Sequence, residues 1–150
     1  MKAGPVELEY WETAALEVAQ SVAVAVPPIS EEEDAEIHRL MVLADSAPNA
    51  TILESFGLIE REVRAIVNRS ELPAPRTVPV PVIADKLVAA GAITPESATA
   101  IRGLATLRNV AAHGADSDLP AASRAREYVV LTTAVLFALR HKSTASSTSA

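Results

Sequence analysis

Apolar residues recur at spacings of three and four in the middle of the chain, and this pattern constrains the fold more than any other feature of the sequence. The residues are Ile52, Phe56, Ile59, Val63 and Ile66. Side chains with this spacing share one face of an α-helix, whereas a half-buried strand alternates every second residue. We therefore expect a long amphipathic helix that begins at the break formed by Pro48 and Asn49.

The composition favours a bundle of helices around one core. Hydrophobic residues make up 49% of the 150 residues and aromatic residues only 3%. Alanine and valine dominate the apolar set, and small side chains allow helices to pack closely. The length is that of one ordinary domain. We predict an all-α bundle of about five to six helices.

The chain divides into three regions. Residues 1–29 form an N-terminal extension, with a short strand at residues 6–10, where apolar and acidic residues alternate, and a helix from Trp11 to Pro27. The β-branched run "SVAVAV" leaves a strand open as an alternative there. Residues 30–142 form the helical domain. Residues 143–150, "STASSTSA", are low in complexity and predict a disordered tail.

Start and stop signals place further helices in the domain. Ser30 and Glu33 form a capping box that opens one helix. Thr94, Pro95 and Glu96 open a second, which runs to about Ala112 and ends at Gly114. The expected buried residues of the first helix are Ile37, Leu40, Met41 and Ala44.

Two segments complete the expected bundle. Residues 71–82, "ELPAPRTVPVPV", hold four prolines and predict an extended linker. A short helix follows, with Val82, Ile83 and Leu87 inward and Gly91 as its stop. The last helix begins at Asp118 or Leu119. Its expected buried residues are Tyr128, Leu131, Val135 and Leu139.

Charge and cysteine content limit the functions. The net charge is −6, and residues 1–50 hold two basic against ten acidic side chains. This half is a poor surface for nucleic acid, whereas the second half can present a cluster of arginines. The absence of cysteine excludes disulfides, thiolate zinc sites and a cysteine nucleophile. It fits a cytoplasmic chain, and neither a bilayer span nor a secretory signal is expected.

No metal or cofactor is expected. The acidic run Glu31 to Asp34 is explained by the favourable helix dipole at a helix start. His38 is expected on the solvated side of the same helix. His141 is expected near the last turn of the final helix, where its charge suits the dipole. Neither histidine has a partner at ligand spacing.

The stretch "LRNVAAHG" carries the candidate site residues Arg108, Asn109 and His113. On a helical wheel Arg108 falls at the edge of the core, and Asn109 and His113 point nearly opposite. Ala105 and Ala112 lie between them and form a small face that could admit another helix. The alternative interpretation is a purely structural helix end, in which Arg108 pairs with a carboxylate and His113 interacts with the last carbonyls of the helix.

This motif in an all-helical domain resembles the HEPN superfamily. The family carries an Arg, four to six residues and then His near the end of a penultimate helix, commonly with a polar residue after the Arg. Here Arg108, Asn109 and His113 match that pattern. The resemblance covers roughly residues 30–141, and "PNATILESFGLIEREVRAI" also looks like the first long helix of the bacterial branch.

The resemblance implies metal-independent cleavage of RNA by attack of the 2′-hydroxyl on the adjacent phosphate, which leaves a cyclic phosphate. His113 would be the general acid and base, Arg108 would neutralise charge on the phosphate, and Asn109 would orient the His or a phosphate oxygen. It also implies a homodimer with RNA as substrate, in a bacterial defence or toxin-like system where an antitoxin or another protein is a partner.

Two features depart from an active family member. The chain is acidic, and it lacks a basic track for RNA. In addition, many members of the family are inactive partners. A non-catalytic HEPN-like interaction or dimerisation module is therefore the alternative function. The segment "KAGPVELEYWETAALE" also resembles the part that follows a membrane anchor in some bacterial relatives. A longer form would then be membrane-associated.

Overall fold

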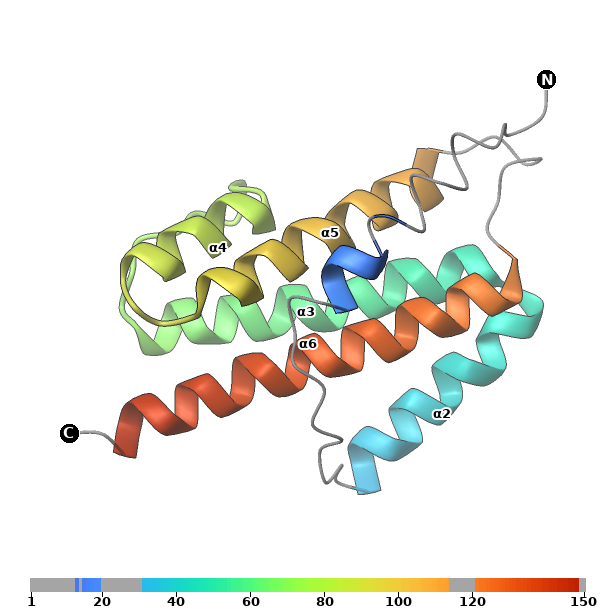
Figure 1. The fold of residues 1–150 in the computed structure, drawn as a ribbon, viewed down its shortest axis with the longest axis horizontal. Helices are drawn as coiled ribbons and strands as arrows, with labels where there is room; N and C mark the ends of the chain where they lie inside the picture. The colour runs from blue at the N-terminus through green and yellow to red at the C-terminus, as the bar shows by residue number, and fades with distance from the viewer. Residues whose placement is uncertain (1–12, 14, 20–30, 114–120, 149–150) are drawn as a thin grey trace.

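The computed structural model of the chain is all-helical over the residues that it describes, which are 13, 15–19, 31–113 and 121–148. Five helices have defined bounds: α2 (Glu31–Ser46), α3 (Pro48–Arg69), α4 (Val80–Ala89), α5 (Pro95–His113) and α6 (Ala122–Thr148) (Figure 1). Of residues 113 and 142–148 the backbone alone is described. The prediction of an all-α bundle is confirmed. The predicted strand at residues 6–10 lies outside the described residues.

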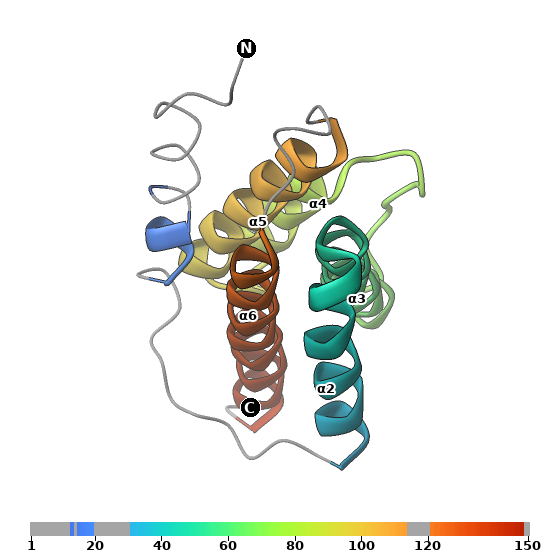
Figure 2. The same ribbon diagram turned by 90° about the vertical axis from the view of Figure 1, so that its right-hand side faces the viewer.

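Helix α3 is the centre of the bundle. It packs against α2, α4, α5 and α6, and Figure 2 shows it between α2 and the α4–α5 pair. Proline occupies its first turn, where a missing N–H leaves no bond unmade. All five residues of the repeating apolar pattern are buried, as predicted, and Ile52, Ile59 and Val63 are fully excluded from solvent. The periodicity therefore identified both the helix and the face that it buries.

Helix α6 runs alongside α3 and closes the core. Tyr128, Leu131, Val135 and Leu139 are buried, as predicted. Its start was predicted too early, at Asp118 or Leu119. The helix begins at Ala122, and the carbonyl of Ala121 accepts the first backbone hydrogen bonds. Leu119 precedes Pro120, and the residue before a proline is disfavoured in helical conformation.

The far end of α6 also differs from the prediction. The helix continues to Thr148 through residues 143–148, where a disordered tail was expected. No glycine or proline follows Pro120, so nothing in the sequence interrupts the helix. His141 therefore stands seven residues before the helix end rather than in its last turn. Its ring contacts Phe137 instead, with ring centroids 3.8 Å apart.

The proline-rich segment forms more helix than expected. Helix α4 begins at Val80, so the prediction of an extended linker to residue 82 was wrong at its end. Pro81 lies in the first turn of α4, where proline is tolerated. Val82 points outward and is 45% exposed, contrary to prediction, whereas Ile83 and Leu87 are buried. Gly91 ends the helix with φ of 74°, as predicted.

Helix α5 starts as the sequence predicts. The backbone N–H of Ser97 donates to Thr94 Oγ1 at 3.1 Å, and Pro95 is the first helical residue. The predicted end at Gly114 and the capping residue Ser30 of α2 lie outside the described residues. On α2, Leu40 and Ala44 are buried, Ile37 and Met41 are half-buried, and His38 is exposed as expected.

The N-terminal helical residues 15–19 contribute to the same core as the bundle. Ala15 and Val18 are buried and belong to one apolar cluster with residues of α3, α5 and α6. The predicted extension 1–29 thus includes residues that pack inside the domain. None of the described helices is both long enough and apolar enough to cross a bilayer.

Candidate functional site

The last turns of α5 carry the predicted site residues. Arg108 is half-buried and Asn109 is exposed. Arg108 Nη1 donates a hydrogen bond to Asn109 Oδ1, with the two atoms 3.3 Å apart. Asn109 therefore contacts the arginine, whereas the resemblance implies that it orients His113 or a phosphate oxygen. His113 ends α5, and its side chain lies outside the described part of the chain.

A buried tyrosine on α6 lies close to Arg108. Tyr128 is fully excluded from solvent, and its hydroxyl donates to the carbonyl oxygen of Leu104 at 2.8 Å. Burial raises the pKa of the Tyr128 hydroxyl well above its ordinary value, and the positive charge of Arg108 acts in the opposite direction. The sequence predicted Tyr128 as a core residue only. A buried tyrosine hydroxyl usually has a partner, so its need for one was the available signal.

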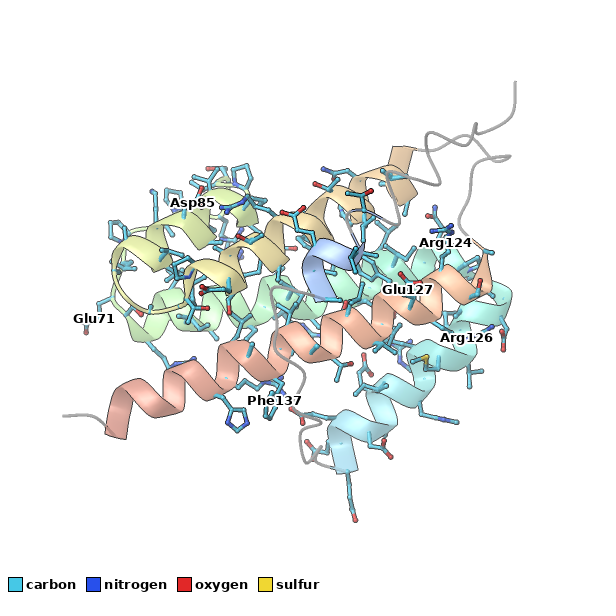
Figure 3. All side chains as sticks on the ribbon, viewed as in Figure 1. Glu71, Asp85, Arg124, Arg126, Glu127 and Phe137 are labelled. Atoms are coloured by element: carbon cyan, nitrogen blue, oxygen red, sulfur yellow. The ribbon has the colours of Figure 1, made fainter. Side chains whose placement is uncertain are left out.

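Most arginines of the described residues are paired with carboxylates. These pairs join neighbouring turns and neighbouring helices over the surface, from Asp85 on α4 to Arg126 near the start of α6 (Figure 3). The paired arginines are Arg39, Arg64, Arg69, Arg102, Arg126 and Arg140. Arg108 forms no ion pair with any carboxylate that the structure describes.

The predicted small face on α5 is not intact. Ala112 is exposed, but Ala105 is only 8% exposed and belongs to the protein's own core cluster. A helical wheel shows which residues share a direction and cannot show which other segment covers them. At Ala105 the predicted face is therefore covered by the protein's own core and is not open at the surface.

Comparison with known proteins identifies no relative. No family model matches the sequence, no curated protein is significantly similar to it, and no solved structure is significantly similar to its fold. The resemblance to the HEPN superfamily accordingly stays a prediction based on Arg108, Asn109 and His113. Within the described residues, no three His, Asp or Glu side chains gather as ligands for a metal ion.

Proposed function

We propose that this chain is a metal-independent endoribonuclease of HEPN type that acts as a homodimer. The observation that supports the proposal best is that Arg108 forms no ion pair among the described residues. In a chain with 19 acidic and 13 basic side chains, this half-buried arginine has no carboxylate partner among the described residues. A purely structural arginine would be expected to pair with an acid, as the exposed Arg102 of α5 does with Asp85 of α4.

The proposed reaction uses the RNA as its own nucleophile. The 2′-oxygen bonds to phosphorus, the bond from phosphorus to the 5′-oxygen breaks, and the products are a 2′,3′-cyclic phosphate and a free 5′-hydroxyl. His113 takes the proton of the 2′-hydroxyl or gives one to the departing oxygen. Arg108 stabilises the negative charge that develops on the phosphate oxygens.

The proposal includes a second copy of the chain because the reaction needs two proton transfers. One motif offers one histidine, and two motifs around a shared cleft would offer a base and an acid. Asn109 holds the guanidinium of Arg108 through its Oδ1, and we assign it a positioning role in the same cleft. An antitoxin or another protein partner would act by covering that cleft.

Cleavage of a labelled, mixed-sequence RNA pool in EDTA tests the proposal. The native chain is compared with His113→Ala, Arg108→Ala and the matched control Arg102→Ala. Arg102 lies on the same helix and is exposed, and it pairs with Asp85. We expect cleavage that survives EDTA and leaves cyclic phosphate ends. Both site variants should lose at least about a hundredfold in rate, His113→Ala through loss of general acid–base catalysis and Arg108→Ala through loss of charge stabilisation. Arg102→Ala should keep its rate.

Two outcomes would contradict the nuclease. A folded dimeric protein that cuts no RNA would favour the non-catalytic interaction module, and so would cleavage that is equally fast in His113→Ala. Analytical ultracentrifugation of the same samples supplies the oligomeric state. Residual cleavage that EDTA abolishes would indicate a contaminating metal-dependent nuclease.

A further inference from the structure

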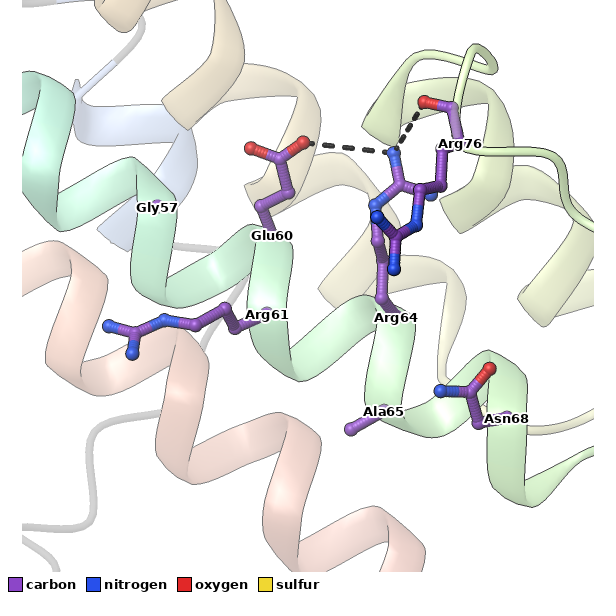
Figure 4. Close-up of a pocket in the computed structure, with 7 residues that line it drawn as sticks. All are labelled: Gly57, Glu60, Arg61, Arg64, Ala65, Asn68 and Arg76. Atoms are coloured by element: carbon purple, nitrogen blue, oxygen red, sulfur yellow. Dashed lines mark hydrogen bonds and ion pairs between the residues drawn. The ribbon is translucent and has the colours of Figure 1, made fainter.

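The second half of α3 and the linker that follows it border an open depression of about 490 Å³ (Figure 4). Its charged lining is three arginines and one glutamate, in a protein whose net charge is −6. The remaining residues are small or neutral. The lining residues are Gly57, Glu60, Arg61, Arg64, Ala65, Asn68 and Arg76. A local excess of positive charge in an acidic chain indicates a site for an anion.

Arg64 builds one wall of the depression. Its Nη2 donates to the backbone carbonyls of Arg76 and Val78, at 3.2 and 3.4 Å, and lies 3.7 Å from Glu60 Oε2. These bonds hold the linker against α3 and bring Arg76 to the rim. Among the described contacts only Nη2 is used, so Nε and Nη1 can donate to another acceptor.

Arg76 and Arg61 are exposed. Arg76 forms no ion pair with a carboxylate among the described residues, whereas Arg61, after Arg39, helps to lower the pKa of the Glu36 carboxyl. Figure 4 shows Arg76 beside Arg64, whereas the side chain of Arg61 extends the other way, away from both. Two neighbouring guanidinium groups repel each other unless an anion lies between them. Planar guanidinium groups match the geometry of phosphate oxygens, so a phosphate is the anion that this arrangement fits best.

Gly57 leaves room at the edge of the same depression. A Cβ atom built on Gly57 would meet nothing within 4 Å, so close packing does not require glycine here. Glycine inside a helix lowers its stability. Together with Ala65, which has only a methyl side chain, it leaves space for the part of a ligand that follows the phosphate.

The surroundings limit the size of the ligand. Arg61 also borders a second hollow. It is lined by four carboxylates and by one further cation, Arg140, which pairs with two of them; the carboxylates are Glu32, Glu33, Glu36 and Glu62. An extended polyanion such as an RNA strand would meet this negative surface as it left the depression. We propose that the depression on α3 binds a small phosphate monoester. This site is separate from Arg108, and it stands whether or not the chain cleaves RNA.

Isothermal titration calorimetry of the full chain tests the proposal, with inorganic phosphate, phenyl phosphate and a single-stranded RNA oligonucleotide as probes at matched ionic strength. The variants are Arg76→Gln and Arg61→Gln. Arg126→Gln is the matched control, because it removes the same charge from an exposed pair with Asp45 elsewhere on the bundle. Circular dichroism shows that each variant is folded.

We expect one or both small phosphates to bind, and Arg76→Gln to weaken binding about tenfold, as for the loss of one charge-assisted hydrogen bond. Arg61→Gln should weaken binding less than Arg76→Gln, because Arg61 extends away from Arg64 and Arg76, and Arg126→Gln should leave binding unchanged. Tighter binding of phenyl phosphate than of inorganic phosphate would show that the space at Gly57 holds the organic group. Equal binding would identify a free phosphate ion as the ligand of the depression.

Three results would overturn the proposal. The first is no binding of either small phosphate by the native chain. The second is an equal loss in all three variants, which would indicate a general charge effect. The third is binding of RNA without binding of the small probes, which would assign an extended polyanion to this surface.

Discussion

The side chain of Tyr128 connects two helices at the place where the candidate site lies. Its hydroxyl on α6 bonds to the carbonyl of Leu104 on α5. That carbonyl lies one helical turn before Arg108, so the bond holds the segment that presents the arginine. Tyr128 does not reach the surface, and its role is therefore to position α5 rather than to contact a substrate.

Replacement of Tyr128 by phenylalanine should cost about 1 kcal/mol of unfolding free energy, since the ring still fills the core and one hydrogen bond is lost. The change should also make the unfolding free energy fall less steeply as the pH rises into the alkaline range. Burial raises the pKa of Tyr128 in the folded chain, whereas an unfolded tyrosine titrates near about 10. Stability from this group is complete below that pH and falls as the pH rises above it.

Urea unfolding of both proteins between neutral pH and about pH 11, which spans the ordinary tyrosine pKa, measures the two effects. Thr133→Ala is the control, because the described bond of the Thr133 hydroxyl stays within α6, to the carbonyl of Val129. An alkaline slope that is the same in native and Tyr128→Phe proteins would contradict the assigned pKa direction.

At the scale of the element, α5 begins with a helix cap at Thr94 and carries the candidate site residues at its other end. Thr94 accepts the backbone N–H of Ser97 and its hydroxyl also contacts Ser97 Oγ, both at 3.1 Å. The motif stands at the opposite end of the same helix. The cap therefore stabilises the helix whose opposite end presents Arg108.

Thr94→Ala should destabilise the protein by about 1 kcal/mol, the usual cost of a lost helix cap. Thr99→Ala is the matched control, because the Thr99 hydroxyl donates to the carbonyl of Pro95 within the helix. Its effect should stay within about 0.5 kcal/mol. Denaturant midpoints measure both changes, and equal midpoints for the two variants would show that the cap contributes nothing.

The elements could be predicted where the signal is local. The apolar spacing in α3 and the cap of α5 both depend on residues within a few turns of each other, and both predictions are confirmed. The linker prediction was wrong beyond Val80 because proline content alone does not distinguish a linker from the first turn of a helix.

The candidate site was predictable only in part. The position of Arg108 and Asn109 on a helix that ends near His113 followed from local pattern. The bond from Tyr128 to Leu104 and the burial of Ala105 depend on segments far apart in the sequence. Such contacts leave no periodic signal in a single sequence.

At the scale of the whole molecule, the core draws on segments from both ends of the described chain. Val18 near the start is fully buried, and so is Leu139 in the second half of α6. Both belong to the cluster that surrounds α3. The N-terminal helical residues are therefore part of the cooperative unit and not an appendage to it.

Val18→Ala should destabilise the folded chain by about 2 kcal/mol, because it removes two buried methyl groups and leaves a cavity. Leu16→Ala is the control, since Leu16 is 58% exposed and should change stability little. Thermal or urea unfolding compares them. A native-like midpoint for Val18→Ala would mean that residues 15–19 do not pack on the bundle in solution.

The position of α6 at the late end of the core has a consequence for synthesis in the cell. The apolar face of α3 leaves the ribosome well before Leu139 does, and α6 is the helix that closes the core along α3. During that interval the nascent chain displays the most regular hydrophobic surface in the protein without its cover, which is the kind of surface that chaperones bind. The bundle can therefore complete its fold only after α6 has left the ribosome.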